Sequence, residues 1–171
     1  MMVDASELGD GGFAPKVLDE LFPAADFALL QQYVEKLAGL PDLPADVERG
    51  RHYLRNLSLM VDIHRDMKDL VSRVVGFELK PSYTLLSFYG PRAVVERHLD
   101  RPQCEVTLTY CISQDQPWDL YVGDGRYRLE ENQALVFAGR RQPHHRDPIQ
   151  SEYCRMALFH FVRSDFFGSL D

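Results

Sequence analysis

The second half of this chain is a series of short segments rich in β-branched and aromatic residues. Turn-forming pairs such as Gly90-Pro91 separate them, and Gly123-Asp124-Gly125 between two of them is typical of a hairpin. Short strands at this spacing predict an antiparallel sandwich or barrel. The segments are YTLLSFY (83–89), AVVERHL (93–99), EVTLTYCI (105–112), DLYVG (119–123), RYRLE (126–130), ALVFAG (134–139) and CRMALFHFV (154–162).

The first half has helical periodicity instead. Apolar residues recur at helical spacing over residues 26–39 and again over residues 60–76, and a glycine ends each stretch. A shorter helix is expected over residues 16–22, before a proline. Two prolines in segment 41–50 predict a loop there.

Together these patterns predict one domain over residues 1–171 that is mainly β with N-terminal helices. A helical layer over about residues 12–80 is expected to pack on a β-sandwich core over about residues 81–162. Hydrophobic residues make up 45% of the chain, which is enough to build such a core.

Charge and composition argue against several classes of partner. The net charge of −7 disfavours nucleic acid and anionic membrane surfaces, and by itself favours a cationic or neutral substrate. No apolar run approaches the length of a membrane span. The N-terminus lacks the basic and apolar regions of an export signal, and the three cysteines show no paired spacing. We therefore expect a cytoplasmic protein with reduced thiols.

A histidine and a carboxylate lie two residues apart at the end of segment 93–99. Residues two apart on a strand point to the same face, so His98 and Asp100 are expected to project together. A second imidazole follows segment 134–139, at either His144 or His145. Two histidines and one carboxylate on one face are the ligand set of non-haem Fe(II) oxygenases. The alternative is a polar pair on the edge of a sandwich.

These segments resemble the 2-oxoglutarate/Fe(II)-dependent dioxygenases, in the prolyl-hydroxylase-like and phytanoyl-CoA-hydroxylase-like group. The resemblance covers about residues 81–162, roughly half of the chain. It implies a double-stranded β-helix (jelly-roll, cupin-like) core buttressed by helices, and an enzyme that uses Fe(II), 2-oxoglutarate as co-substrate and dioxygen. The matching pieces are PSYTLLSFYG, HLDRPQCEVTLTY, ALVFAGRRQPHHRDP and CRMALFHFV.

The resemblance also implies roles for individual residues. His98, Asp100 and His144 would be the iron ligands, since His144 lies eleven residues before Arg155; a spacing of ten would favour His145 instead. Arg155 would bind the distal carboxylate of 2-oxoglutarate, since a buried arginine on a strand needs such a partner.

Three further residues are implied near the co-substrate. Tyr83 and Tyr89 precede the His-x-Asp motif, where a tyrosine often lines the co-substrate pocket, and Arg146 would reach co-substrate or substrate. Because Asp100 is present, where halogenating members have Gly or Ala, the resemblance implies hydroxylation of an unactivated C–H bond. The substrate would be a small molecule, an amino acid or a peptide.

Two other functions are compatible with the same predicted core. One is a cupin-type metal enzyme that does not use 2-oxoglutarate; such sites generally carry three histidines and do not need Arg155. The other is a non-catalytic binding protein on the same fold, which would be expected to lose a metal ligand.

Overall fold

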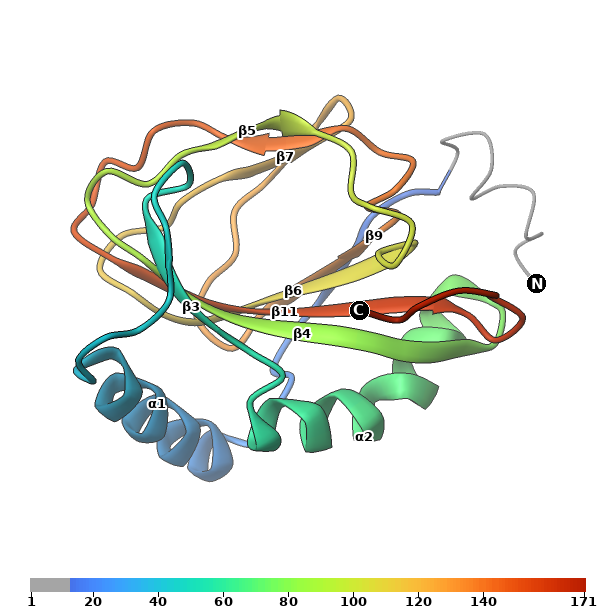
Figure 1. The fold of residues 1–171 in the computed structure, drawn as a ribbon, viewed down its shortest axis with the longest axis horizontal. Helices are drawn as coiled ribbons and strands as arrows, with labels where there is room; N and C mark the ends of the chain where they lie inside the picture. The colour runs from blue at the N-terminus through green and yellow to red at the C-terminus, as the bar shows by residue number, and fades with distance from the viewer. Residues whose placement is uncertain (1–12) are drawn as a thin grey trace.

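The computed structural model describes residues 13–171, and strands dominate this part of the chain (Figure 1). Its elements are β1 (Lys16–Leu18), α1 (Ala24–Ala38), β2 (Ala45–Asp46), β3 (Arg51–Arg55), α2 (Ser58–Val75), β4 (Leu79–Tyr89), β5 (Val95–His98), β6 (Val106–Gln114), β7 (Leu120–Val122), β8 (Gly125–Tyr127), β9 (Ala134–Phe137), β10 (His144–Arg146) and β11 (Cys154–Arg163). The described strands form two antiparallel sheets, a seven-stranded one in the order β1-β9-β6-β11-β4-β3-β2 and a four-stranded one in the order β5-β10-β7-β8. This arrangement is consistent with a jelly roll.

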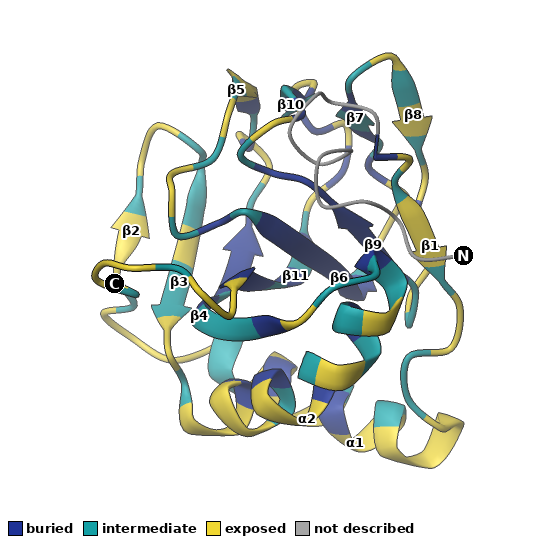
Figure 2. Cartoon of the chain, turned by 90° about the vertical axis from the view of Figure 1, so that its right-hand side faces the viewer, coloured by how far each residue is buried: buried dark blue, intermediate teal, exposed yellow. Residues whose placement is uncertain are grey.

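The two helices cover one face of the seven-stranded sheet, and the four-stranded sheet lies over the other face (Figure 1). Strand alternation divides the interior accordingly. On β11, Phe159 and Phe161 pack in the cluster that includes Val71 of α2. Cys154 and Met156 pack instead in the cluster that contains residues of the smaller sheet. Figure 2 shows the central strands β6, β9 and β11 buried, whereas the outer faces of the helices are exposed.

The N-terminal part is less helical than its sequence suggests. α1 and α2 lie where the helical periodicity predicts them. Residues 16–22 do not form the expected helix, because Lys16–Leu18 pair with β9 as the edge strand of the larger sheet. The expected loop 41–50 contains β2, which pairs with β3. Thus three strands of the larger sheet come from the segment that was expected to be a helical layer.

A membrane-spanning helix is not found among residues 13–171, since neither helix is both long and apolar enough to cross a bilayer.

Candidate metal centre and its pocket

A cavity of about 300 Å³ is lined by residues of both sheets. Tyr83 and Thr107 belong to the larger sheet, and His98 and His144 to the smaller one. The volume is at the lower end of the range for small-molecule sites.

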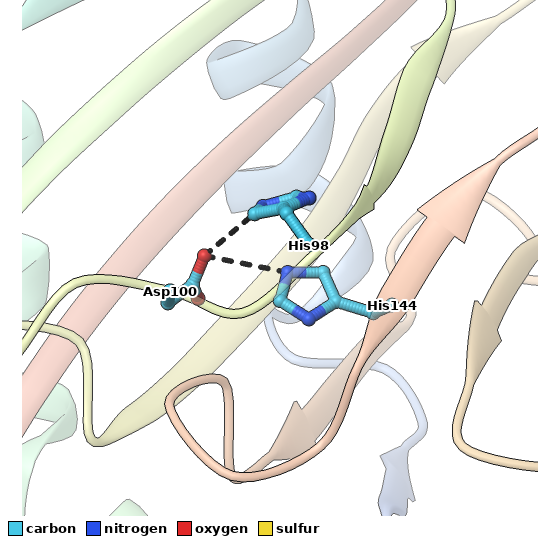
Figure 3. Close-up of side chains that lie close together, drawn as sticks. All are labelled: His98, Asp100 and His144. Carbon is cyan, nitrogen blue, oxygen red and sulfur yellow. Dashed lines mark ion pairs between the residues drawn. The ribbon is translucent and has the colours of Figure 1, made fainter.

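Strand register brings the two distant histidines together. β10 pairs with β5 so that His144 lies directly opposite His98, and their ring centroids are 4.3 Å apart. Asp100 follows β5 by two residues, and its backbone N–H donates to the carbonyl of Gly139 at 2.9 Å. Oδ1 of Asp100 lies 3.3 Å from Nε2 of each histidine (Figure 3). A separation of 46 residues in sequence thus becomes a cross-strand contact.

Hydrogen bonds to backbone carbonyls orient both imidazoles. Nδ1–H of His98 donates to the carbonyl of Glu96 at 2.8 Å, and Nδ1–H of His144 donates to that of Gln142 at 2.9 Å. Since a carbonyl only accepts, the neutral rings carry their proton on Nδ1 and direct the Nε2 lone pair at the carboxylate. The three ligand atoms lie within 4.8 Å of one another. Such a convergence of acceptors fits a metal cation, and the outer Nδ1 bonds are those that orient metal-binding histidines.

The same contacts bias the charge state of Asp100. Burial raises the pKa of its carboxyl, but Nε2–H of His144 or His98, once that ring is protonated, donates to the carboxylate, and these contacts together outweigh burial and hold its pKa well below its usual range. The hydrogen bond to Asp100 is also the main reason why the pKa of His98 is raised. Asp100 is therefore an anion at neutral pH.

The second oxygen of Asp100 is held from the larger sheet. The hydroxyl of Thr107 donates to Oδ2 at 3.0 Å. Having used its single proton, it accepts from Nδ1–H of His160, also at 3.0 Å. Burial lowers the pKa of His160 to about 4, so this ring is neutral. A hydrogen-bonded series thus runs from β11 through β6 to the metal centre.

Sequence reasoning missed Thr107, His160 and Gly139 as parts of this centre. A Cβ on Gly139 would lie 2.1 Å from Oδ2 of Asp100, so only glycine leaves room for the carboxylate. The available signal for His160 was its position on the last strand, on the opposite face from Arg155. The pocket lies on the side of His160, so this face of the strand, and not that of Arg155, contributes to the centre.

Arg155 lies away from the cluster of His98, Asp100 and His144 and does not line the pocket. Its side chain lies on the helix side of β11, where Nε is 3.4 Å from a carboxylate oxygen of Glu35 on α1. Its guanidinium also lies 4.5 Å from the ring centroid of Tyr153. The neighbouring residues Cys154 and Met156 point to the other side, between the sheets. The position of Arg155 therefore does not support its implied role in binding 2-oxoglutarate, and the expected carboxylate partner is Glu35.

Arg146 lies in the pocket instead. It follows His144 by two residues on β10 and is 5% exposed. Its guanidinium donates to the carbonyl of Trp118 and lies 4.9 Å from the centroid of that indole ring. Within residues 13–171 it makes no ion pair with a carboxylate. A buried cation without an anion is costly, so Arg146 is suited to bind a ligand carboxylate.

Of the remaining residues expected at the site, two line the pocket and one lies outside it. Tyr83 and Tyr89 both line the pocket. The hydroxyl of Tyr83 lies 3.2 Å from Sγ of Cys104, and the ring of Tyr89 packs edge-on against Trp118. His145 lies outside it, stacked on Tyr121 with ring centroids 4.7 Å apart. His144, and not His145, is therefore the second histidine of the cluster.

Known proteins match this chain in fold but not in sequence. No protein-family model matches the chain, and no curated protein matches it either. Among solved structures, a viral collagen prolyl hydroxylase from Paramecium bursaria Chlorella virus-1, in complex with 2-oxoglutarate, has a TM-score of 0.68 at 11% identity, covering 91% of this chain and 99% of that chain. A 2OG-Fe(II) oxygenase family oxidoreductase from Burkholderia pseudomallei has a TM-score of 0.71 at 13% identity, covering 96% and 90%. The non-heme alpha-ketoglutarate-dependent epimerase SnoN from nogalamycin biosynthesis has a TM-score of 0.73 at 11% identity, covering 94% and 81%. The chain thus has the fold of the 2-oxoglutarate/Fe(II) oxygenases.

Proposed function

We propose that this chain is an Fe(II)- and 2-oxoglutarate-dependent oxygenase that hydroxylates a C–H bond of a small molecule, an amino acid or a peptide. The observation that carries the proposal is the convergence of the Nε2 atoms of His98 and His144 on Oδ1 of Asp100. Each Nδ1 is bonded to a backbone carbonyl, which leaves Nε2 available as a ligand. The fold is that of a prolyl hydroxylase solved in complex with 2-oxoglutarate and of a 2OG-Fe(II) oxygenase family oxidoreductase. We accordingly interpret the two sheets as the double-stranded β-helix core of a single domain.

In this proposal the pocket residues have distinct roles. His98, Asp100 and His144 hold Fe(II), and Arg146 binds the distal carboxylate of 2-oxoglutarate in place of Arg155. Tyr89 lines the same end of the pocket through its contact with Trp118, over which Arg146 lies. Arginine suits this role because its planar fork matches a carboxylate.

Bound Fe(II), with 2-oxoglutarate and dioxygen, would supply the oxidation in which one oxygen atom enters the substrate C–H bond and the other enters succinate, with release of carbon dioxide. Asp100 keeps a metal position that halogenating relatives leave to halide, which is why we propose hydroxylation. Phe137 and Leu158 line the pocket as apolar walls, and they limit the access of water to the reacting groups.

Anaerobic titration of the metal-free protein tests this function. We expect Fe(II) to bind, and subsequent 2-oxoglutarate to produce the visible charge-transfer absorption of its chelate with iron. An Asp100→Ala variant should show no such absorption. Iron binding without the absorption would favour a cupin-type enzyme that does not use 2-oxoglutarate. Absence of iron binding would favour a non-catalytic binding protein.

A further inference from the structure

The charge of the pocket is opposite to that of the whole chain. The chain has a net charge of −7, yet among residues 13–171 the cavity is lined by four arginines, no lysine and one carboxylate, Asp100. The arginines are Arg49, Arg51, Arg101 and Arg146. The bulk charge therefore does not predict the sign of a ligand for this pocket.

Arg49 and Arg51 share a single carboxylate. Asp46 lies 3.2 Å from Nη1 of Arg49 and 3.1 Å from Nη2 of Arg51. Arg51 is fixed further by a hydrogen bond to the hydroxyl of Ser87 at 2.9 Å. The side chain of Arg49 is 39% exposed, whereas that of Arg51 is 10% exposed. One anion thus serves two cations, and Arg49 is the more accessible of the two.

Arg101 comes from a different element, in the loop after Asp100. Its guanidinium lies 5.1 Å from the ring centroid of Tyr83. Within residues 13–171 its side chain makes no ion pair and no hydrogen bond. Leu99, which also lines the pocket, is 53% exposed. The rim near the metal centre therefore combines an unpaired cation with an exposed apolar side chain.

The excess positive charge remains once the proposed co-substrate is counted, and this step rests on the proposed function. Fe(II) and Arg146 together balance Asp100 and the two carboxylates of 2-oxoglutarate. Asp46 balances only one of the arginines near β3. Arg49 and Arg101 are then left with excess positive charge in the lining of the cavity.

We propose that the substrate carries a carboxylate or phosphate group, and that Arg49 and Arg101 bind this group at the rim of the pocket. Both side chains line the same cavity as His98, so a substrate anchored there presents its neighbouring carbon atoms to the metal centre. Leu99 contacts the apolar part of such a molecule.

The test is calorimetric titration with inorganic sulfate, a tetrahedral dianion, at constant ionic strength. The protein is loaded with Mn(II), which replaces Fe(II) in air, and saturated with 2-oxoglutarate. We expect sulfate to bind, and Arg101→Gln and Arg49→Gln each to raise its dissociation constant at least about tenfold, as for loss of a charged hydrogen bond. Arg97→Gln is the matched control. It removes the same charge from β5, beside His98, but Arg97 does not line this pocket.

Three results would overturn the inference. Equal sulfate affinity in wild type and in both rim variants would exclude these arginines as the site. An equal loss in Arg97→Gln would indicate a general field effect. Binding only when 2-oxoglutarate is absent would place sulfate in the co-substrate position. If instead the iron absorption fails while sulfate binding still depends on Arg101, the oxygenase assignment is wrong and the anion site stands.

Discussion

Asp100 can occupy its position only because residue 139 has no side chain. Gly139 accepts a hydrogen bond from the backbone N–H of Asp100. At the same time its Cα faces the carboxylate, and a Cβ there would also lie 2.8 Å from Oγ1 of Thr107. The backbone of one residue thus fixes both the main chain and the side chain of the proposed ligand.

Gly139→Ala should therefore impair metal binding. Its methyl group would displace the Asp100 carboxylate, so we expect Fe(II) affinity to fall by about 10–100-fold, as for lost support of a metal ligand. Anaerobic Fe(II) titration measures the change. Gly39→Ala is the control, since a Cβ there meets only ordinary contact at 3.7 Å. Wild-type affinity in Gly139→Ala would show that the carboxylate tolerates displacement or is not a ligand.

The hydroxyl of Thr107 should orient Asp100 in the same way. Thr107→Val keeps the shape of the side chain but removes the donor to Oδ2 and leaves Nδ1–H of His160 unpaired, which costs about 1–3 kcal/mol of stability. We expect weaker Fe(II) binding and a lower unfolding temperature. Thr109→Val is the matched control, because Thr109 is equally buried and lines the pocket without a bond to Asp100. Equal losses in the two variants would mean that a buried threonine matters only for packing.

At the scale of elements, strand alternation decides which arginine lies in the pocket. Arg155 is on the helix face of β11 and Arg146 on the pocket face of β10. We expect Arg146→Gln to raise the dissociation constant of 2-oxoglutarate at least about tenfold, while Arg155→Gln leaves it unchanged. The measurement is titration of the Fe(II) protein with 2-oxoglutarate, with Fe(II) affinity as the control. If Arg155→Gln raised the dissociation constant and Arg146→Gln did not, Arg155 would have the role that the resemblance implies for it.

The sequence predicted which segments form helices and strands better than it predicted which side of a sheet each side chain occupies. The strand segments after residue 80 and both long helices correspond to observed elements, because period and turn residues are local signals. β1 was missed, since pairing with β9 is a tertiary contact that a three-residue strand does not encode. Residue type and order predicted that His98, Asp100 and His144 lie together, as the structure shows; that they bind a metal stays a prediction. Arg155 was expected to face the co-substrate but lies on the helix face of β11. Its distance in sequence from His144 does not say which face of the strand the pocket adjoins.

The whole molecule should lose stability in mild acid, in part through His64 on α2. Nε2–H of His64 donates to the carbonyl of His160 at 2.8 Å, and burial lowers the pKa of His64 from 6.5 to about 4. Between these values only the unfolded state binds the proton, so the stabilisation is complete above pH 6.5 and is lost as the pH falls to 4. The loss is on the order of 3 kcal/mol for this shift.

His64→Gln tests this coupling, because glutamine can still donate to the carbonyl but does not titrate. Urea unfolding at pH 7, 6 and 5 should show a weaker pH dependence in this variant than in wild type. The free energy of unfolding should still depend on pH in this variant, since burial also lowers the pKa of His160. His52→Gln, at an exposed position, should keep the wild-type slope. An unchanged slope in His64→Gln would mean that His64 does not titrate on unfolding.

Metal loading should stabilise the entire fold, because the centre joins its two sheets. His98 and His144 belong to the smaller sheet, while Thr107 on the larger sheet holds Asp100. A metal that binds only the folded state adds about 2.7 kcal/mol at a concentration 100 times its dissociation constant, which for a chain of this size raises the unfolding temperature by roughly 5–10 °C. Thermal unfolding with Mn(II), and again after chelation, measures this increase. Asp100→Ala should respond to neither treatment; an equal increase in that variant would place the metal elsewhere on the chain.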